Sequence, residues 1–135
     1  MAVTGNCLCG SIEVTLQSKP KEIIVCYCTS CQKASGGTAS YNMITQDSES
    51  EITKGRTKIF KEIGDSGNNL ERHFCDCCGS AIYSVTESYQ GLKIFKAALF
   101  SDIKGMKVVT NIWTGSAPDW ACIDESVPSF VKSRT

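Results

Sequence analysis

The sequence lacks the features that would direct a chain to or through a membrane. Residues 1–7 carry no basic start followed by an apolar stretch, so no secretory signal peptide is visible. The longest apolar runs, such as residues 23–26, fall far short of the about 20 residues that span a bilayer. We therefore expect a soluble cytoplasmic protein, with the nucleus as a second location and no membrane partner.

The chain also lacks an excess of charge of either sign. Its 14 Lys and Arg residues balance 14 Asp and Glu residues, which gives no electrostatic reason to expect nucleic acid as a partner. It has one histidine, no internal repeat, no low-complexity tract and no interdomain linker. A length of 135 residues therefore predicts one domain over residues 1–135.

No segment shows a helical period of 12 or more residues. Residues 11–17 alternate, with Ile12, Val14 and Leu16 apolar, and this segment with other short apolar segments predicts a mainly β protein. Val, Ile, Phe, Tyr and Thr are frequent in eight candidate strands. These are residues 11–17, 23–28, 40–45, 57–62, 70–74, 81–85, 92–98 and 107–113. Two short helices are expected, one from Thr29 or Ser30 and one from Ser116, and residues 64–69 read as a polar loop.

Cysteine, in contrast, is abundant. Nine cysteines form three groups and one isolated residue, and an odd number excludes complete disulfide pairing within one chain. Thiols stay reduced inside cells, so clustered cysteines there favour metal binding or thiol chemistry. The groups are Cys7 and Cys9; Cys26, Cys28 and Cys31; and Cys75, Cys77 and Cys78, with Cys122 alone.

The first and third groups predict one four-cysteine zinc site. Cys9 and Cys78 are each followed by glycine, which lets the backbone fold around a pair of sulfurs. Zinc takes four thiolates tetrahedrally, so we assign Cys7 and Cys9 with Cys75 and Cys78 as ligands of a structural zinc. Spacing alone leaves Cys77 as an alternative to Cys78.

The middle group offers three thiols without an obvious fourth ligand. Three protein ligands with an open position are typical of a catalytic zinc, whereas a closed set of four is structural. A second structural zinc, completed by His73, Cys77, Cys122 or a carboxylate, remains the alternative on spacing alone. A redox pair of Cys28 and Cys31 is disfavoured, because the flanking βαβ pattern is missing.

These motifs, taken in order, resemble the glutathione-dependent formaldehyde-activating enzyme (GFA) family, which includes centromere protein V. The resemblance spans nearly the whole chain. It rests on residues 5–10 (GNCLCG), 26–36 (CYCTSCQKASG), 72–80 (RHFCDCCGS), the region from Ile112 and Trp113 to Trp120, and residues 128–130 (PSF).

The resemblance implies a twisted antiparallel β-sheet zinc fold, shared with methionine sulfoxide reductase B and a Rab-binding chaperone. It also implies two zinc ions per chain. Cys7, Cys9, Cys75 and Cys78 would hold the structural ion, and Cys26, Cys28 and Cys31 would hold the ion at the active site. The activity implied is that of a carbon–sulfur lyase, which adds the small-molecule thiol glutathione to formaldehyde and gives S-hydroxymethylglutathione.

The sequence departs from the family at two polar positions. Many members carry His where this chain has Tyr27, and many carry His where it has Asn111. The alternative function is a non-catalytic zinc module that binds a protein partner, as the Rab-binding relative suggests. Chromatin association, by analogy with centromere protein V, is disfavoured by the balanced charge. His73 is expected to lie at the surface or behind the ligands, Cys77 to point away from the first site, and Cys122 to be a buried or half-buried small apolar residue near Trp120.

Overall fold

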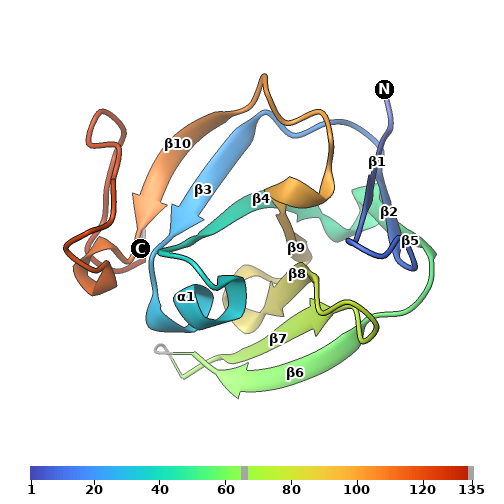
Figure 1. The fold of residues 1–135 in the computed structure, drawn as a ribbon, viewed down its shortest axis with the longest axis horizontal. Helices are drawn as coiled ribbons and strands as arrows, with labels where there is room; N and C mark the ends of the chain where they lie inside the picture. The colour runs from blue at the N-terminus through green and yellow to red at the C-terminus, as the bar shows by residue number, and fades with distance from the viewer. Residues whose placement is uncertain (65–66, 134–135) are drawn as a thin grey trace. The chain divides into compact units, whose positions relative to one another are not determined.

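The computed structural model describes residues 1–64 and 67–133, and this part of the chain forms ten strands and one α-helix (Figure 1). The strands are β1 (Val3–Asn6), β2 (Glu13–Leu16), β3 (Glu22–Cys26), β4 (Ser40–Gln46), β5 (Ser50–Lys54), β6 (Lys58–Ile63), β7 (Asn69–Phe74), β8 (Ala81–Thr86), β9 (Leu92–Lys96) and β10 (Lys107–Ile112). The helix α1 covers Thr29–Ser35. Short 3-10 turns cover Asp47–Glu49, Glu87–Tyr89, Ala97–Leu99 and Thr114–Ser116. The prediction of a mainly β protein is therefore confirmed.

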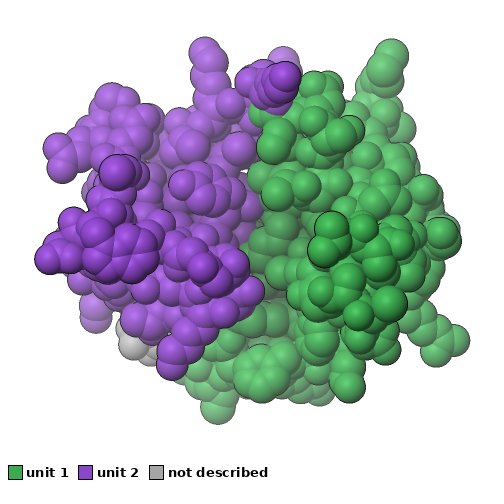
Figure 2. All heavy atoms as spheres, viewed as in Figure 1, with its two compact units in different colours: residues 1–20, 44–103 green, residues 21–43, 104–135 purple. Residues whose placement is uncertain are grey.

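The chain divides into two compact units (Figure 2). Unit 1 comprises residues 1–20 and 44–103, and unit 2 comprises residues 21–43 and 104–135. Strand β4 contributes its first residues to unit 2 and its last residues to unit 1.

Unit 1 contains a small antiparallel sheet in the order β1-β2-β5. Side chains alternate between the two faces of β2. Val14 and Leu16 are fully buried on one face, and Glu13 and Thr15 on the other face are only partly buried. In the same unit a second set of strands follows the order β4-β9-β8-β7-β6. The pairs β6–β7, β7–β8 and β8–β9 are antiparallel, and the buried side chains of these strands include Ile82 and Phe95.

Unit 2 contains neighbouring strands in the order β10-β3-β4, together with the helix α1. Strand β3 pairs antiparallel with β4 but parallel with β10. The expectation of a mainly β, antiparallel sheet fold is confirmed, and the sheet is mixed because a long connection allows β3 and β10 to run in the same direction. Val25, Tyr27 and Ala39 form the core of the unit, and Ala117, Ala121 and Ile123 pack against them.

The helix expected from Ser116 does not form; a 3-10 turn ends there. The segment that follows instead uses its backbone groups to cover the end of β10. The amide of Asn111 donates to the Pro128 carbonyl at 3.0 Å, and the amide of Phe130 donates to the Asn111 carbonyl at 2.9 Å. Trp113, which separates β10 from the turn, has a left-handed backbone with φ of 58°. Tertiary pairing thus overrides the local signal for a helix start.

The other predicted elements are present with shifted ends, and α1 begins at Thr29 as expected. Strands β1 and β5 were not predicted, because β1 contains Gly5 and both strands are short and polar. The predicted loop over residues 64–69 includes residues 65 and 66, which lie outside the described residues. Within the described residues, no helix has the length and apolar character needed to cross a membrane.

Candidate metal centres

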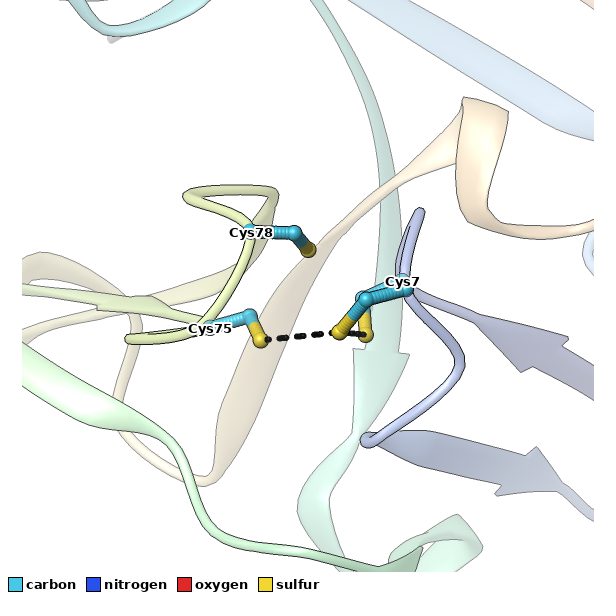
Figure 3. A group of neighbouring side chains, drawn as sticks. Cys7, Cys75 and Cys78 are labelled. Carbon is cyan, nitrogen blue, oxygen red and sulfur yellow. Dashed lines mark hydrogen bonds between the residues drawn. The ribbon is translucent and has the colours of Figure 1, made fainter.

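Unit 1 brings together the thiols of Cys7, Cys9, Cys75 and Cys78, whose sulfur atoms all lie within 4.8 Å of one another. Figure 3 shows the labelled side chains of Cys7, Cys75 and Cys78 pointing toward one another. The Sγ atom of Cys9 lies 3.7 Å from that of Cys7 and 3.7 Å from that of Cys75. A tetrahedral zinc with bonds of about 2.3 Å separates its sulfur ligands by about 3.8 Å, so the four thiols fit this metal.

Two tight turns place these four sulfurs. In the first, the amide of Gly10 donates to the Cys7 carbonyl at 3.0 Å, and Gly10 has φ of 79°. In the second, the amide of Gly79 donates to the Cys75 carbonyl at 2.8 Å, and Gly79 has φ of 78°. A left-handed backbone strongly favours glycine, which is the physical reason for a glycine after each cysteine pair.

Ser11 and Ser80 were missed by the sequence analysis, and both contact the sulfurs. The Ser11 hydroxyl lies 3.1 Å from Cys9 Sγ and 3.2 Å from Cys75 Sγ. The Ser80 hydroxyl lies 3.2 Å from Cys78 Sγ and accepts the amide of Leu8 at 3.1 Å. The triplet Cys-Gly-Ser occurs at both turns, and this repetition was the available signal. The Sγ atom of Cys7 lies 3.8 Å from the Ser11 hydroxyl and accepts the amide of Ile12 at 3.2 Å.

The electrostatics of this cluster also fit a cation. Hydrogen bonds from the Ser80 hydroxyl and amide lower the pKa of Cys78 to about 5. The hydroxyl of Ser11 lowers the pKa of Cys9, but burial and the thiols of Cys7 and Cys78 outweigh it and raise the value to about 11. Neighbouring thiolates repel one another, so a bound dication is what allows all four groups to ionise together.

Unit 2 brings together Cys26, Cys28 and Cys31, whose Sγ atoms also lie within 4.8 Å of one another. Cys26 is the last residue of β3, and Cys28 is the N-cap of α1. The amide of Cys31 donates to Cys28 Sγ at 3.2 Å, so the first turn of α1 forms around that sulfur. No further His, Cys, Asp or Glu ligand atom joins this group among the residues that the structure describes.

The three thiols of unit 2 oppose one another's ionisation. Hydrogen bonds to Cys28 and Cys31, together with burial, raise the pKa of Cys26. The pKa of Cys28 is also raised, because contact with Cys31 and burial outweigh the hydrogen bond from Cys26. Three partly buried soft donors of this kind fit a thiophilic cation such as zinc.

The two polar positions that depart from the family pattern have structural roles in unit 2. Tyr27 is 3% exposed and packs in the core with Val25 and Ala39. Its pKa is raised by burial, so the phenol stays protonated near neutral pH. Asn111 is 1% exposed, and its amide donates to the Asp124 carbonyl at 2.9 Å and to the Ser129 hydroxyl at 3.0 Å. Asn111 therefore anchors the C-terminal segment.

The remaining candidates lie outside both thiol groups. His73 stacks on Tyr83 with ring centroids 4.0 Å apart, and its Nδ1 lies 2.7 Å from the Thr57 hydroxyl. Burial lowers the pKa of His73 below its usual value. Cys77 is exposed in the turn that carries Cys75 and Cys78. Cys122 is exposed in unit 2, so the expectation that it is buried or half-buried is wrong. Cys78, rather than Cys77, is thus the residue whose sulfur joins the cluster of unit 1.

Fold and sites define a mainly β protein with two separate cysteine clusters, each able to hold a metal ion. The family model for the glutathione-dependent formaldehyde-activating enzymes matches residues 2–116. This match covers most of the chain, which therefore belongs to the GFA family.

Two curated relatives, both named "Putative glutathione-dependent formaldehyde-activating enzyme", are similar to the chain. The protein from Halomonas elongata is 29% identical over 129 residues, which cover 92% of this chain and 82% of the relative. The protein from Fusarium vanettenii is 28% identical over 102 residues, which cover 72% of this chain and only 54% of that relative.

A solved structure supports the fold. The crystal structure of a protein from Rhodobacter sphaeroides matches with a TM-score of 0.59 at 17% sequence identity. The match covers 73% of this chain and 88% of that protein. At this identity the likeness concerns the fold alone.

Proposed function

We propose that this protein is a zinc-dependent enzyme of the carbon–sulfur lyase type that acts on a thiol adduct. The candidate reaction is the addition of glutathione to formaldehyde, which gives S-hydroxymethylglutathione. The observation that carries the proposal is the group of Cys26, Cys28 and Cys31, which no fourth protein ligand joins among the described residues. The family name and the names of the two relatives support glutathione and formaldehyde as substrates.

The two clusters would have different tasks. Cys7, Cys9, Cys75 and Cys78 would hold a structural zinc, because four thiolates complete a tetrahedral shell. The group of three would hold a second zinc and leave one position for a substrate thiol. When bound there, zinc supplies a Lewis acid that keeps a coordinated thiol ionised at neutral pH. We further propose that residues 1–135 act as one domain, since the family match begins at residue 2 and extends to residue 116.

Backbone and side-chain hydrogen bonds around Cys26, Cys28 and Cys31 would hold the three thiols in place. Cys26 pairs with Ile112 at the end of β10, and the amide of Tyr27 donates to the Ile112 carbonyl at 3.0 Å. The side-chain amide of Gln32 donates to the Tyr27 carbonyl at 2.7 Å and to the Ser116 carbonyl at 3.0 Å. These bonds fix the turn between β3 and α1 before a substrate binds, which reduces the reorganisation that catalysis requires.

The proposed reaction balances without a redox partner. The glutathione thiol loses a proton to solvent, and its sulfur forms a bond to the formaldehyde carbon. The C=O electron pair moves to oxygen, which takes a proton from water. Neither Tyr27, buried in the core, nor Asn111, engaged with the C-terminal segment, is placed to supply that proton.

Adduct formation tests this proposal directly. NMR exchange measurements would follow glutathione and formaldehyde with the zinc-loaded protein, with Cys31→Ser and with Cys122→Ser. We expect acceleration over the spontaneous reaction by the wild type and by Cys122→Ser, and its loss in Cys31→Ser. Equal rates with and without wild-type protein would contradict the proposal and favour a non-catalytic zinc module.

A further inference from the structure

Strand β6 in unit 1 exposes an unusual amount of apolar surface. Ile59 is 44% exposed, Phe60 is 58% exposed and Ile63 is 71% exposed. Strands normally bury their apolar residues on one face, yet β6 carries exposed apolar side chains on both faces. The proposed reaction gives these side chains no task.

Strand β6 is also the edge strand of its sheet. It pairs with β7 from Lys58 opposite Phe74 to Ile63 opposite Asn69, and within residues 1–64 and 67–133 the strand order ends there. Figure 1 shows β6 on the outer side of β7. An edge strand presents a row of backbone N–H and C=O groups that can pair with another extended strand.

We propose that β6 is a self-association edge, at which two copies of this chain pair their β6 strands antiparallel about a two-fold axis. Such an axis lets each copy present the same strand to the other, so one segment must be complementary to itself. The sequence of β6, Lys-Ile-Phe-Lys-Glu-Ile, meets this requirement in one particular register.

In that register, Phe60 lies opposite Phe60 of the second copy. Lys58 then lies opposite Glu62 of the second copy, and the symmetry axis creates this opposite-charge pair twice. Lys58, Phe60 and Glu62 share one face of β6, because side chains alternate along a strand. Aromatic pairs and opposite-charge pairs across an antiparallel ladder are both stabilising.

Neighbouring registers are less favourable. A shift of two residues in one direction sets Lys61 against Lys61, which is a like-charge pair. A shift in the other direction sets Phe60 against Lys58 and removes the aromatic pair. A shift by a single residue is excluded, because a two-fold axis normal to the sheet keeps each side chain on its own face.

The ion pair between Arg72 and Glu62 is compatible with this arrangement. It holds the Glu62 carboxylate on the face shared with Phe60. A carboxylate has two oxygens and accepts hydrogen bonds from more than one cation. Lys58 is exposed and is available to approach from the second copy. A single six-residue strand is a small interface compared with the about 1,200–2,000 Å² of stable complexes, so the dimer is weak and concentration-dependent.

Sedimentation velocity of the zinc-loaded full chain, from about 1 μM to about 1 mM, tests this proposal. The monomer mass is 14.6 kDa, and we expect the average mass to rise toward twice that value. Lys58→Glu creates two like-charge pairs with Glu62 and should weaken association by about tenfold or more. Phe60→Thr keeps the β propensity, removes the aromatic pair and should also weaken association.

Lys61→Glu is the matched control, because it makes the same charge change on the same strand but lies opposite Ile59. We expect it to shift the association constant by no more than about twofold. Zinc content and circular dichroism verify that each variant is folded. A wild-type protein that stays monomeric over the whole range overturns the proposal. So does a dimer that Lys58→Glu leaves intact, or an equal effect of Lys58→Glu and Lys61→Glu.

Discussion

The two cysteine clusters differ in how the chain assembles them. The cluster of unit 1 joins two turns whose ligands Cys9 and Cys75 are 66 residues apart. The cluster of unit 2 draws all three thiols from one strand end and the helix that follows, residues 26–31. Closing a long loop carries a larger entropy cost than closing a short one, so a metal at the first cluster stabilises the fold more. The second cluster is local, so a metal held there would contribute less to the stability of the fold.

The largest expected effect is the loss of stability when one thiol of the unit 1 cluster is removed. Cys75→Ser should abolish cooperative folding or lower the melting temperature severely, because structural zinc contributes about 10 kcal/mol or more of apparent binding free energy in small zinc domains. Thermal unfolding followed by circular dichroism measures this change. Cys77→Ser is the control from the same turn, and its melting temperature should match that of the wild type. Equal losses in both variants would contradict the assignment of ligands.

The second expected effect concerns unit 2. Cys31→Ser should reduce the metal content from two zinc ions per chain to one, because two thiols alone hold zinc weakly. The melting temperature should fall by much less than in Cys75→Ser, since the first cluster remains complete. Elemental analysis and calorimetry measure the two quantities. Cys122→Ser should retain two zinc ions. A Cys31→Ser protein that unfolds as readily as Cys75→Ser would remove the distinction between the clusters.

A smaller effect tests the packing that supports unit 2. Asn111→Ala should lower the free energy of unfolding by about 1–3 kcal/mol, because it removes the two hydrogen bonds that this buried side-chain amide donates to the Asp124 carbonyl and the Ser129 hydroxyl. Urea denaturation measures the loss. Asn69→Ala, at an exposed position of β7, should change stability by less than about 0.5 kcal/mol. An unchanged Asn111→Ala protein would show that the C-terminal segment does not depend on this anchor.

The smallest expected effect concerns the serine hydroxyls that contact the sulfurs of unit 1. Ser11→Ala should speed zinc loss to a chelator by about tenfold, because its hydroxyl contacts three of the four sulfurs. Ser80→Ala should have a smaller effect, since its hydroxyl contacts only Cys78 Sγ among the cluster sulfurs. The exposed Ser48→Ala is the control. Equal release rates in all three variants would show that these hydroxyls do not stabilise the bound metal.

Spacing predicted the three thiols of unit 2, whereas in unit 1 spacing alone left Cys77 open and the glycine after Cys78 favoured Cys78 as the ligand. The Cys-Gly pairs marked both turns of unit 1, and the interval between Cys26 and Cys31 is too short to separate the thiols widely. The serines were missed because a hydroxyl next to a thiol has no periodicity of its own. Only the turn geometry shows that Ser11 contacts Cys75, a residue 64 positions away.

Alternating apolar residues predicted β2, and the local content of β-branched and aromatic residues predicted most other strands, including β8. The parallel pairing of β10 with β3 and the extended path after Ser116 could not be predicted locally. Both depend on hydrogen bonds between distant segments, such as the bond from the Asn111 amide to the Pro128 carbonyl. The Ser-Ala-Pro-Asp sequence still has the form of a helix start, but in the structure Ala117 and Ala121 pack against the core of Val25, Tyr27 and Ala39 without forming a helix.

The central claim is that Cys26, Cys28 and Cys31 hold a metal with one position left for a substrate thiol. Cobalt substitution makes that position visible, because the optical spectrum of cobalt reports its ligands. Titration of the cobalt-loaded protein with glutathione should shift the spectrum in a saturable way, and the shift should be absent in Cys31→Ser. A spectrum that saturating glutathione leaves unchanged would contradict the claim.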